Sequence, residues 1–237
     1  MRVFIGFDPR EAAAYLACRD SLRRVTNRQI EPEPLDVVDL RRRGLLTRLV
    51  DHRDGQDYDL ISNRHTATRF NISRFLVPIL CQQGPALFVD CDTIFYRDPR
   101  DMLSKHIKRE GWALRCVKHE HVPSSDTKMV GQRQRPYDRK NWSSVMLFDC
   151  SHPANDRLSL WDVNNRDRED LHGLYWLNED VEIGALDPAW NWLVNEQPRP
   201  DNLGIAHFTN GGPWLPGWEG APNDDLWLEA AHQWRHE

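Results

Sequence analysis

The segment that most constrains this chain is Ala-Leu-Phe-Val-Asp-Cys-Asp, residues 86–92. Its apolar residues predict a buried strand, and two carboxylates follow it one residue apart. Side chains two apart in an extended chain lie on the same side, so Asp90 and Asp92 are expected to project together from the carboxyl end of that strand. Open α/β sheets bind ligands at this edge, and paired carboxylates suit Mg²⁺ or Mn²⁺ shared with phosphates.

The same spacing occurs a second time, in Asp57-Tyr58-Asp59. That copy lies in a polar, turn-rich segment with no apolar run before it, and the pattern alone predicts a solvated loop. Burying unpaired carboxylates is costly, so the buried strand before Asp90 favours a functional role for the later pair.

Composition narrows the class of protein. The chain has 237 residues, 40% of them hydrophobic, which suits one large soluble domain. Its net charge of −5 argues against a general nucleic-acid binder. Five scattered cysteines with no Cys-x-x-Cys pair suggest neither a disulfide framework nor a zinc site. With no predicted signal peptide or membrane span, we expect a cytoplasmic protein; its oligomeric state stays open.

Alternating apolar strands and amphipathic helices indicate an α/β sheet. Pro78 is expected to kink one helix, and residues 118–140 are interpreted either as a loop over a site or as a plain connector. The segment up to about residue 68 lacks strong periodicity. The expected strands cover residues 3–7, 35–40, 86–89, 112–117, 144–149 and 203–208, and the expected helices cover 11–25, 72–81, 102–107 and 225–235.

A second apolar strand runs into His207 and is followed by Phe-Thr-Asn-Gly-Gly-Pro-Trp. His207 could complete a metal site with the two aspartates, and glycines let backbone amides approach a diphosphate. A hydrogen-bonded structural histidine is the alternative.

Six blocks in order carry a family resemblance: FIGFD, SRFLVPIL, ALFVDCDTIFYRDP, NWSSVMLFD, LNEDVEIGALDPAWNWL and HFTNGGPW. Through them the chain resembles the glycogenin-like (family 8) retaining glycosyltransferases of GT-A fold. The resemblance implies one α/β domain over residues 1–237, with a mixed central sheet flanked by helices. Residues 1–92 would form the nucleotide-binding half and residues 93–237 the acceptor-side half.

The resemblance also implies a nucleotide-diphosphate sugar as donor, with Mn²⁺ or Mg²⁺ held by Asp90, Asp92 and His207. Asp8 would reach the base or ribose. Tyr15 could lie against the base or belong to the core, and Arg74 would steady the diphosphate or form a surface ion pair. The implied donor-binding residues are Phe7, Asp8, Tyr15, Arg74, Asp90, Cys91, Gly211, Gly212 and Trp214.

The resemblance assigns the chemistry to two further segments. Glu179 and Asp180, in LNED, would contact the donor sugar or lie beneath its C1, although a solvated helix cap explains them as well. Asn141 and Ser143 resemble the family's sugar-contacting segment.

The loop after His207 departs from the family pattern, because the phosphate-binding lysine before Pro-Trp is replaced by Gly212. Either the amides of Gly211 and Gly212 suffice, or cations from residues 128–140 close over the donor, or catalysis is impaired. We favour the cations, and expect joint neutralisation of Arg135, Arg139 and Lys140 to weaken donor binding.

Ten tryptophans are many for this length, and all but Trp112 lie from residue 142 onward. Core burial is the default for most of them, but aromatic faces also stack on sugars. Trp214 and Trp218 are the candidates for such a role, since they flank Pro216-Gly217 beyond His207.

The leading hypothesis is therefore a metal-dependent enzyme that moves a hexose from a nucleotide sugar, with UDP favoured, and retains the anomeric configuration. The acceptor would be a hydroxyl of a glycan, a glycolipid or another molecule. A nucleotidyltransferase of similar fold and a catalytically degenerate carbohydrate-binding or scaffold protein are the alternatives.

Overall fold

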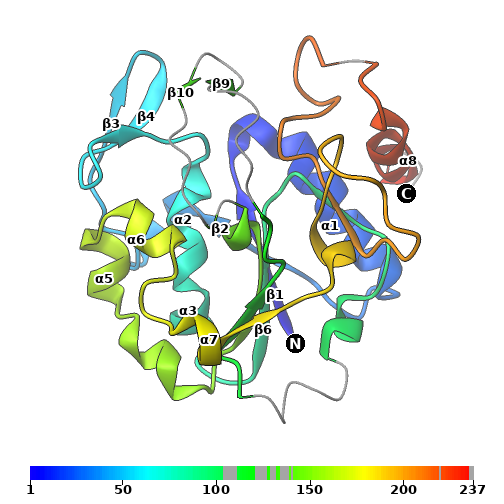
Figure 1. The fold of residues 1–237 in the computed structure, drawn as a ribbon. Helices are drawn as coiled ribbons and strands as arrows, with labels where there is room; N and C mark the ends of the chain where they lie inside the picture. The colour runs from blue at the N-terminus through cyan, green and yellow to red at the C-terminus, as the bar shows by residue number, and fades with distance from the viewer. Residues whose placement is uncertain are drawn as a thin grey trace.

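The computed structural model describes residues 1–103, 111–120, 127–128, 132–133, 139, 141–218 and 220–234. Strands and helices alternate through most of this part of the chain (Figure 1). The strands are β1 (Arg2–Phe7), β2 (Glu33–Asp36), β3 (Val50–Arg53), β4 (Gln56–Asp59), β5 (Arg64–His65), β6 (Pro85–Val89), β7 (Thr93–Phe95), β8 (Leu114–Cys116), β9 (Thr127–Lys128), β10 (Gln132–Arg133), β11 (Val145–Asp149), β12 (Ile183–Ala185), β13 (Trp192–Leu193) and β14 (Ile205–His207).

The helices are short apart from the first and the last. The α-helices are α1 (Ala12–Val25), α2 (Val37–Arg42), α3 (Val77–Cys81), α5 (Leu160–Asn165), α6 (Arg168–His172), α7 (Glu179–Glu182) and α8 (Asp224–Trp234). The 3₁₀ turns are η1 (Pro9–Glu11), η2 (Arg69–Asn71), η3 (Ser73–Leu76), η4 (Pro99–Leu103), η6 (Trp142–Ser144), η7 (Pro153–Arg157) and η8 (Pro188–Asn191).

A six-stranded mixed sheet forms the centre, in the order β12-β8-β11-β6-β1-β2. Strand β1 pairs in parallel with β2 and β6, and β11 runs antiparallel to both of its neighbours. The carboxyl ends of β6, β1, β2 and β8 therefore reach the same edge as the amino end of β11. The predicted fold class, a mixed sheet flanked by helices, is confirmed.

Helices cover both faces of this sheet. Helices α1 and α8 lie on one side, whereas α2, α3, α5 and α6 lie on the other (Figure 1). The main core contains the buried residues of β1, β6 and β11, while a smaller cluster joins α1, β14 and α8. The apolar runs of the sequence thus supply the centre of the fold, as expected from the burial of their surface.

The strand expected over residues 35–40 is wrong beyond Asp36. Strand β2 ends at Asp36, and its carboxylate accepts a hydrogen bond from the Val38 amide. This N-cap starts α2, which occupies the rest of the predicted strand. The apolar residues there serve a helix because Asp36 caps its first turn.

The interpretation of residues 57–59 as a solvated loop is also wrong. Strands β3, β4 and β5 form a small antiparallel sheet, and Asp59 is buried at the end of β4. The Arg48 guanidinium lies 2.7 Å from its carboxylate. Burial is possible because the carboxylate is paired and hydrogen-bonded.

Other expected elements differ in extent. The helix over 72–81 is split into η3 and α3, with Pro78 in the first turn of α3, where a missing amide is tolerated. The turn η4 begins before residue 102, and residues 104–107 lie outside the described part of the chain. Helix α8 confirms the predicted terminal helix.

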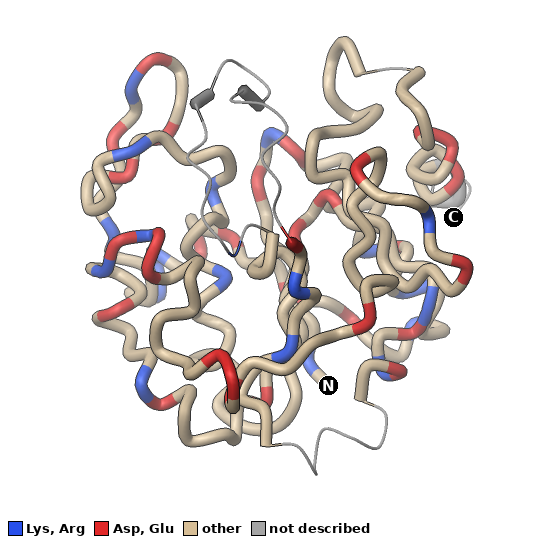
Figure 2. Tube along the Cα trace, in the orientation of Figure 1, with Lys and Arg blue, Asp and Glu red and all other residues tan. Residues whose placement is uncertain are grey.

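Charged residues of both signs alternate over the molecule in the orientation of Figure 2. Within the described ranges, none of the helices combines the length and apolarity needed to cross a bilayer.

Candidate functional site

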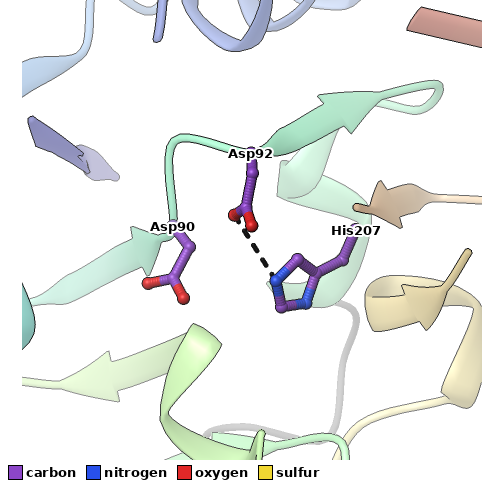
Figure 3. A group of neighbouring side chains, drawn as sticks. All are labelled: Asp90, Asp92 and His207. Atoms are coloured by element: carbon purple, nitrogen blue, oxygen red, sulfur yellow. Dashed lines mark ion pairs between the residues drawn. The ribbon is translucent and has the colours of Figure 1, made fainter. Parts of the chain in front are cut away.

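Asp90, Asp92 and His207 converge at the sheet edge. One ligand atom from each residue lies within 4.8 Å of the others. The Nε2 atom of His207 is 3.4 Å from Oδ1 of Asp92, and Figure 3 shows both carboxylates and the imidazole facing one space. The structure therefore brings together the three residues that the sequence singled out as metal ligands.

Backbone contacts hold these side chains in place. Asp90 follows β6 directly, and its amide donates to the Ser144 carbonyl at 2.9 Å. The Thr93 hydroxyl donates to the Asp90 carbonyl at 2.9 Å, which closes the turn that carries Asp92. Strand β14 pairs with β7 so that His207 lies opposite Thr93. A histidine far along the chain thereby reaches the two aspartates.

Carboxylates outnumber their cations at this edge. Burial raises the pKa of Asp90 to about 6, with Arg74 opposing the shift and Asp92 adding to it. Burial also raises the pKa of Glu11 to about 8, and the charges of Asp92, Asp8 and Asp90 contribute. Glu11 was missed by the sequence analysis, which used it only as a helix start. Such an excess of negative charge suits a cation.

Arg74 is buried, so the surface ion-pair alternative is wrong. Its Nη1 lies 3.0 Å from Oδ1 of Asp90 and donates to the Ser143 carbonyl at 2.8 Å. Its Nε donates to the Asn71 carbonyl at 3.1 Å. Arg74 thus fixes the first metal-site aspartate against the η6 turn, and its contact with a diphosphate stays a prediction.

Asn191 is a second residue that the sequence analysis missed. It is fully buried, and its Oδ1 lies 3.0 Å from Nδ1 of His207. Its Nδ2 donates to the Ser144 hydroxyl at 2.9 Å and to the Asn141 carbonyl at 3.3 Å. The amide therefore joins the histidine to the η6 turn, and no local pattern in the sequence indicates this.

A second asparagine–histidine pair lies on the far side of Ser143. Nδ1 of the buried His172 is 2.7 Å from the Ser143 hydroxyl, and its Nε2 is 2.6 Å from Oδ1 of Asn71. Burial, then the charge of Arg74, lowers the pKa of His172 well below its usual value. The ring is neutral, and both of its nitrogens have partners within the protein.

Two of the predicted donor contacts near β1, Asp8 and Tyr15, are buried and already have partners within the protein. Asp8 is fully buried, and its carboxylate accepts from Arg10 and from the Arg69 amide. Burial favours its neutral form, but these bonds hold its pKa below the usual value. The Tyr15 ring is buried edge-on against Phe7, 5.1 Å between centroids, as in the core alternative.

Cys91, the predicted donor contact between the two aspartates, is buried in the main core. Burial raises the pKa of its thiol well above the usual value. Its side chain therefore packs in the core, and any donor contact would come from its backbone.

Glu179 lies in a cluster of charged side chains with Arg139 and Lys118. Its carboxylate lies 2.5 Å from Arg139 and 3.8 Å from Lys118, and both cations lie over the Trp142 ring. Asp180 is exposed in the first turn of α7, which fits the helix-cap alternative. Their roles toward a donor sugar stay predictions.

Of the three cations chosen for joint neutralisation, Arg139 lies within the described residues, whereas Arg135 and Lys140 lie outside them. Asn141 begins the η6 turn with a left-handed backbone, φ +64°.

The two glycines after His207 both have contacts within the protein. A Cβ on Gly212 would lie 2.2 Å from the Trp214 ring, so only glycine fits there. The Gly211 amide donates to the Phe208 carbonyl at 2.8 Å. Trp214 packs against Phe208 and Trp227, which fits the core default more closely than a platform for sugar.

A cavity of about 290 Å³ lies beyond the carboxyl end of β2. Its lining includes Val37 and Val38, which follow β2, and Arg69 and Asn71 of η2. Because the Arg69 amide also binds Asp8, the cavity adjoins the end of β1.

The donor atoms fit a divalent metal ion. Oδ1 of Asp92 is buried without a hydrogen-bond donor among the described residues. Two carboxylates and one imidazole are ligands that Mn²⁺ accepts, and Mg²⁺ also binds carboxylate oxygens. A shared cation would satisfy the buried carboxylate oxygen of Asp92 that lies beside the imidazole nitrogen.

The architecture defines the class: the chain has the GT-A fold of glycosyltransferases. It superposes on the galactosyltransferase LgtC, solved with donor and acceptor sugar analogs, with a TM-score of 0.58 over 100% of this chain and 99% of LgtC at 14% identity. The glycosyltransferase GlyE of Streptococcus pneumoniae gives 0.57 over 97% of this chain and 59% of GlyE, also at 14% identity. At identities this low, the superpositions show a shared fold and nothing more.

The chain belongs to the family of Protein CDI of Arabidopsis thaliana. The two are 37% identical over 242 residues, which takes in 100% of this chain and 88% of the plant protein. No protein-family model matches the sequence.

Proposed function

We propose that this protein is a metal-dependent glycosyltransferase of the glycogenin-like type, which moves a hexose from a nucleotide-diphosphate sugar to a hydroxyl acceptor with retention of configuration. The observation that carries the proposal is the convergence of Asp90, Asp92 and His207 at the carboxyl edge of a GT-A sheet. LgtC is described with donor and acceptor sugar analogs, which supports the same substrate classes for this chain.

The leaving group of such a reaction is a diphosphate, on which negative charge grows as the bond to sugar C1 breaks. A bound Mn²⁺ or Mg²⁺ would stabilise that charge as a Lewis acid. Asp90, Asp92 and His207 would hold the ion, and Arg74 would keep Asp90 oriented through their 3.0 Å contact.

The nucleoside would extend from the metal site along the sheet edge toward the cavity beyond β2. Arg69 supports this placement, since its amide donates to Asp8 at the end of β1 and the residue also lines the cavity. A UDP-sugar is the donor we favour from the family resemblance. On the other side, Ser143, Asn141, Glu179 and Asp180 are proposed to face the donor sugar, and a glycan or glycolipid hydroxyl is the proposed acceptor.

The test is calorimetric titration of UDP, GDP, TDP and CDP with Mn²⁺ or with EDTA. We expect one nucleotide to bind only with metal, and Asp92→Ala to weaken that binding at least about 100-fold, since a metal ligand is lost. Asp156→Ala is the control, because it removes an exposed carboxylate of η7 that is not among the residues lining the cavity beyond β2, and it should bind as the wild type does.

Two outcomes would contradict the proposal. Failure to bind any of the four nucleotides would favour a degenerate carbohydrate-binding or scaffold protein. Release of pyrophosphate, instead of a nucleoside diphosphate, from a sugar-nucleotide reaction would assign nucleotidyl transfer.

A further inference from the structure

We propose that Asn191 is a positioning residue for the metal site: its side-chain amide sets the His207 tautomer and joins that ligand to the turn that positions Asp90. This inference rests on the proposed metal site and assigns a role to a residue outside the ligand set. Asn191 is fully buried at the end of η8, immediately before β13.

The orientation of the Asn191 amide follows from its neighbours. A main-chain carbonyl can only accept, so the Asn141 carbonyl, 3.3 Å away, requires the NH₂ group of Asn191 to face it. The Ser144 hydroxyl donates to that same carbonyl at 2.7 Å, which leaves its oxygen to accept from Asn191 at 2.9 Å. The Asn191 oxygen must then point the other way, toward His207.

The orientation of the amide fixes the histidine. An amide oxygen only accepts, so Nδ1 of His207, 3.0 Å away, carries a proton. In the neutral ring Nε2 then presents its lone pair, and it faces Oδ1 of Asp92 at 3.4 Å. A metal-ligating histidine needs this tautomer, which a partner on the other nitrogen commonly sets.

The same amide reaches the first aspartate. Ser144, which accepts from Asn191 through its hydroxyl, also accepts the Asp90 amide through its carbonyl at 2.9 Å. Asn191 therefore connects His207 in β14 with Asp90, just beyond β6, through Ser144. An apolar residue would suit this position between Trp190 and Trp192 if packing were its only role.

The test is the affinity of the protein for Mn²⁺ alone, measured by calorimetry without nucleotide. Asn191→Ala should weaken Mn²⁺ binding about 10- to 100-fold, the usual effect of losing an outer partner of a ligating histidine. Asn191→Asp loses the NH₂ group that faces the Asn141 carbonyl but keeps an oxygen that accepts from Nδ1, so it should bind Mn²⁺ more tightly than Asn191→Ala does. A residue needed only for packing would show no such rescue.

Asn155→Ala is the matched control, because it removes another buried asparagine whose amide donates to backbone carbonyls, away from the three proposed ligands. It should change Mn²⁺ affinity less than about 3-fold, even if it lowers the melting temperature. Wild-type affinity in Asn191→Ala, no rescue by Asp, or an equal loss in Asn155→Ala would each overturn the inference.

Asp92→Ala separates this inference from the proposed function. If Asp92→Ala binds Mn²⁺ as well as the wild type, the proposed metal site is wrong. If only Asp92→Ala loses binding while the Asn191 variants keep it, the site stands and the role of Asn191 is wrong.

Discussion

The two Asp-x-Asp pairs of this chain have the same spacing, but their carboxylates differ in whether the protein supplies a counter-charge. In β4 the buried Asp59 is matched by Arg48, whose Nε and Nη2 both donate to its carboxylate. Beyond β6, the guanidinium of Arg74 contacts Asp90 but also donates to two backbone carbonyls. Oδ1 of Asp92 has no hydrogen-bond donor among the described residues. The buried carboxylate of the first pair therefore has its counter-charge within the protein, whereas the second pair is the one that we propose binds a cation.

The largest effect that follows is on stability and concerns Asp59. Asp59→Ala should destabilise the fold by about 3–5 kcal/mol, because it leaves the guanidinium of Arg48 buried without its counter-charge. Urea unfolding measures this change. The control is the double variant Arg48→Met with Asp59→Leu, which removes both charges and should recover most of the loss. A single variant as stable as the wild type would mean that water reaches Arg48.

The second effect is a pH dependence that arises at the sheet edge carrying the later pair, from Glu11 and Asp90. The pKa of Glu11 is raised to about 8 and that of Asp90 to about 6, so the folded protein holds more protons than the unfolded chain above their usual pKa values. Metal-free stability should therefore fall as the pH rises from about 6.5 to 8. Below that range the neutral His119, whose pKa burial lowers to about 4, opposes the trend.

Thermal melts in EDTA at pH 6.5, 7.2 and 8.0 would measure this dependence. Glu11→Gln should remove most of the slope, because it takes away the group that titrates in that window. A slope unchanged in Glu11→Gln would contradict the assignment of the excess charge to this edge. Asp57→Gln is the control, and it should keep the slope of the wild type.

The same contrast explains what the sequence could predict. Continuous apolar runs predicted β1, β6 and β14 correctly, because burial of such runs needs no knowledge of distant partners. The small sheet of β3, β4 and β5 was missed, since its burial depends on an ion pair between Arg48 and Asp59 and not on apolar periodicity. A polar segment can enter a core when its charges are matched.

The candidate site divides in the same way. Asp90, Asp92 and His207 lie at or just beyond the ends of apolar strands, so the sequence and the family resemblance could identify them as candidate ligands. Asn191 and Asn71 each bind a buried histidine that lies 16 and 101 residues away, and nothing near them in the sequence indicates it. His172 and His207 each contact an asparagine through one ring nitrogen, but the other nitrogen of His172 faces Ser143, whereas that of His207 faces the carboxylate of Asp92.

The smallest expected effects compare one neutralised carboxylate from each pair. Asp92→Asn should stabilise the metal-free protein by about 1 kcal/mol, because it relieves repulsion at a site shaped for function. Asp57→Asn should change stability by less than about 1 kcal/mol, since the side chains that it contacts, Arg69 at 3.5 Å and His52 at 3.4 Å, are exposed. Urea unfolding in EDTA would resolve the difference in sign. Destabilisation by Asp92→Asn would mean that its carboxylate is compensated within the protein, and the contrast between the two pairs would then fail.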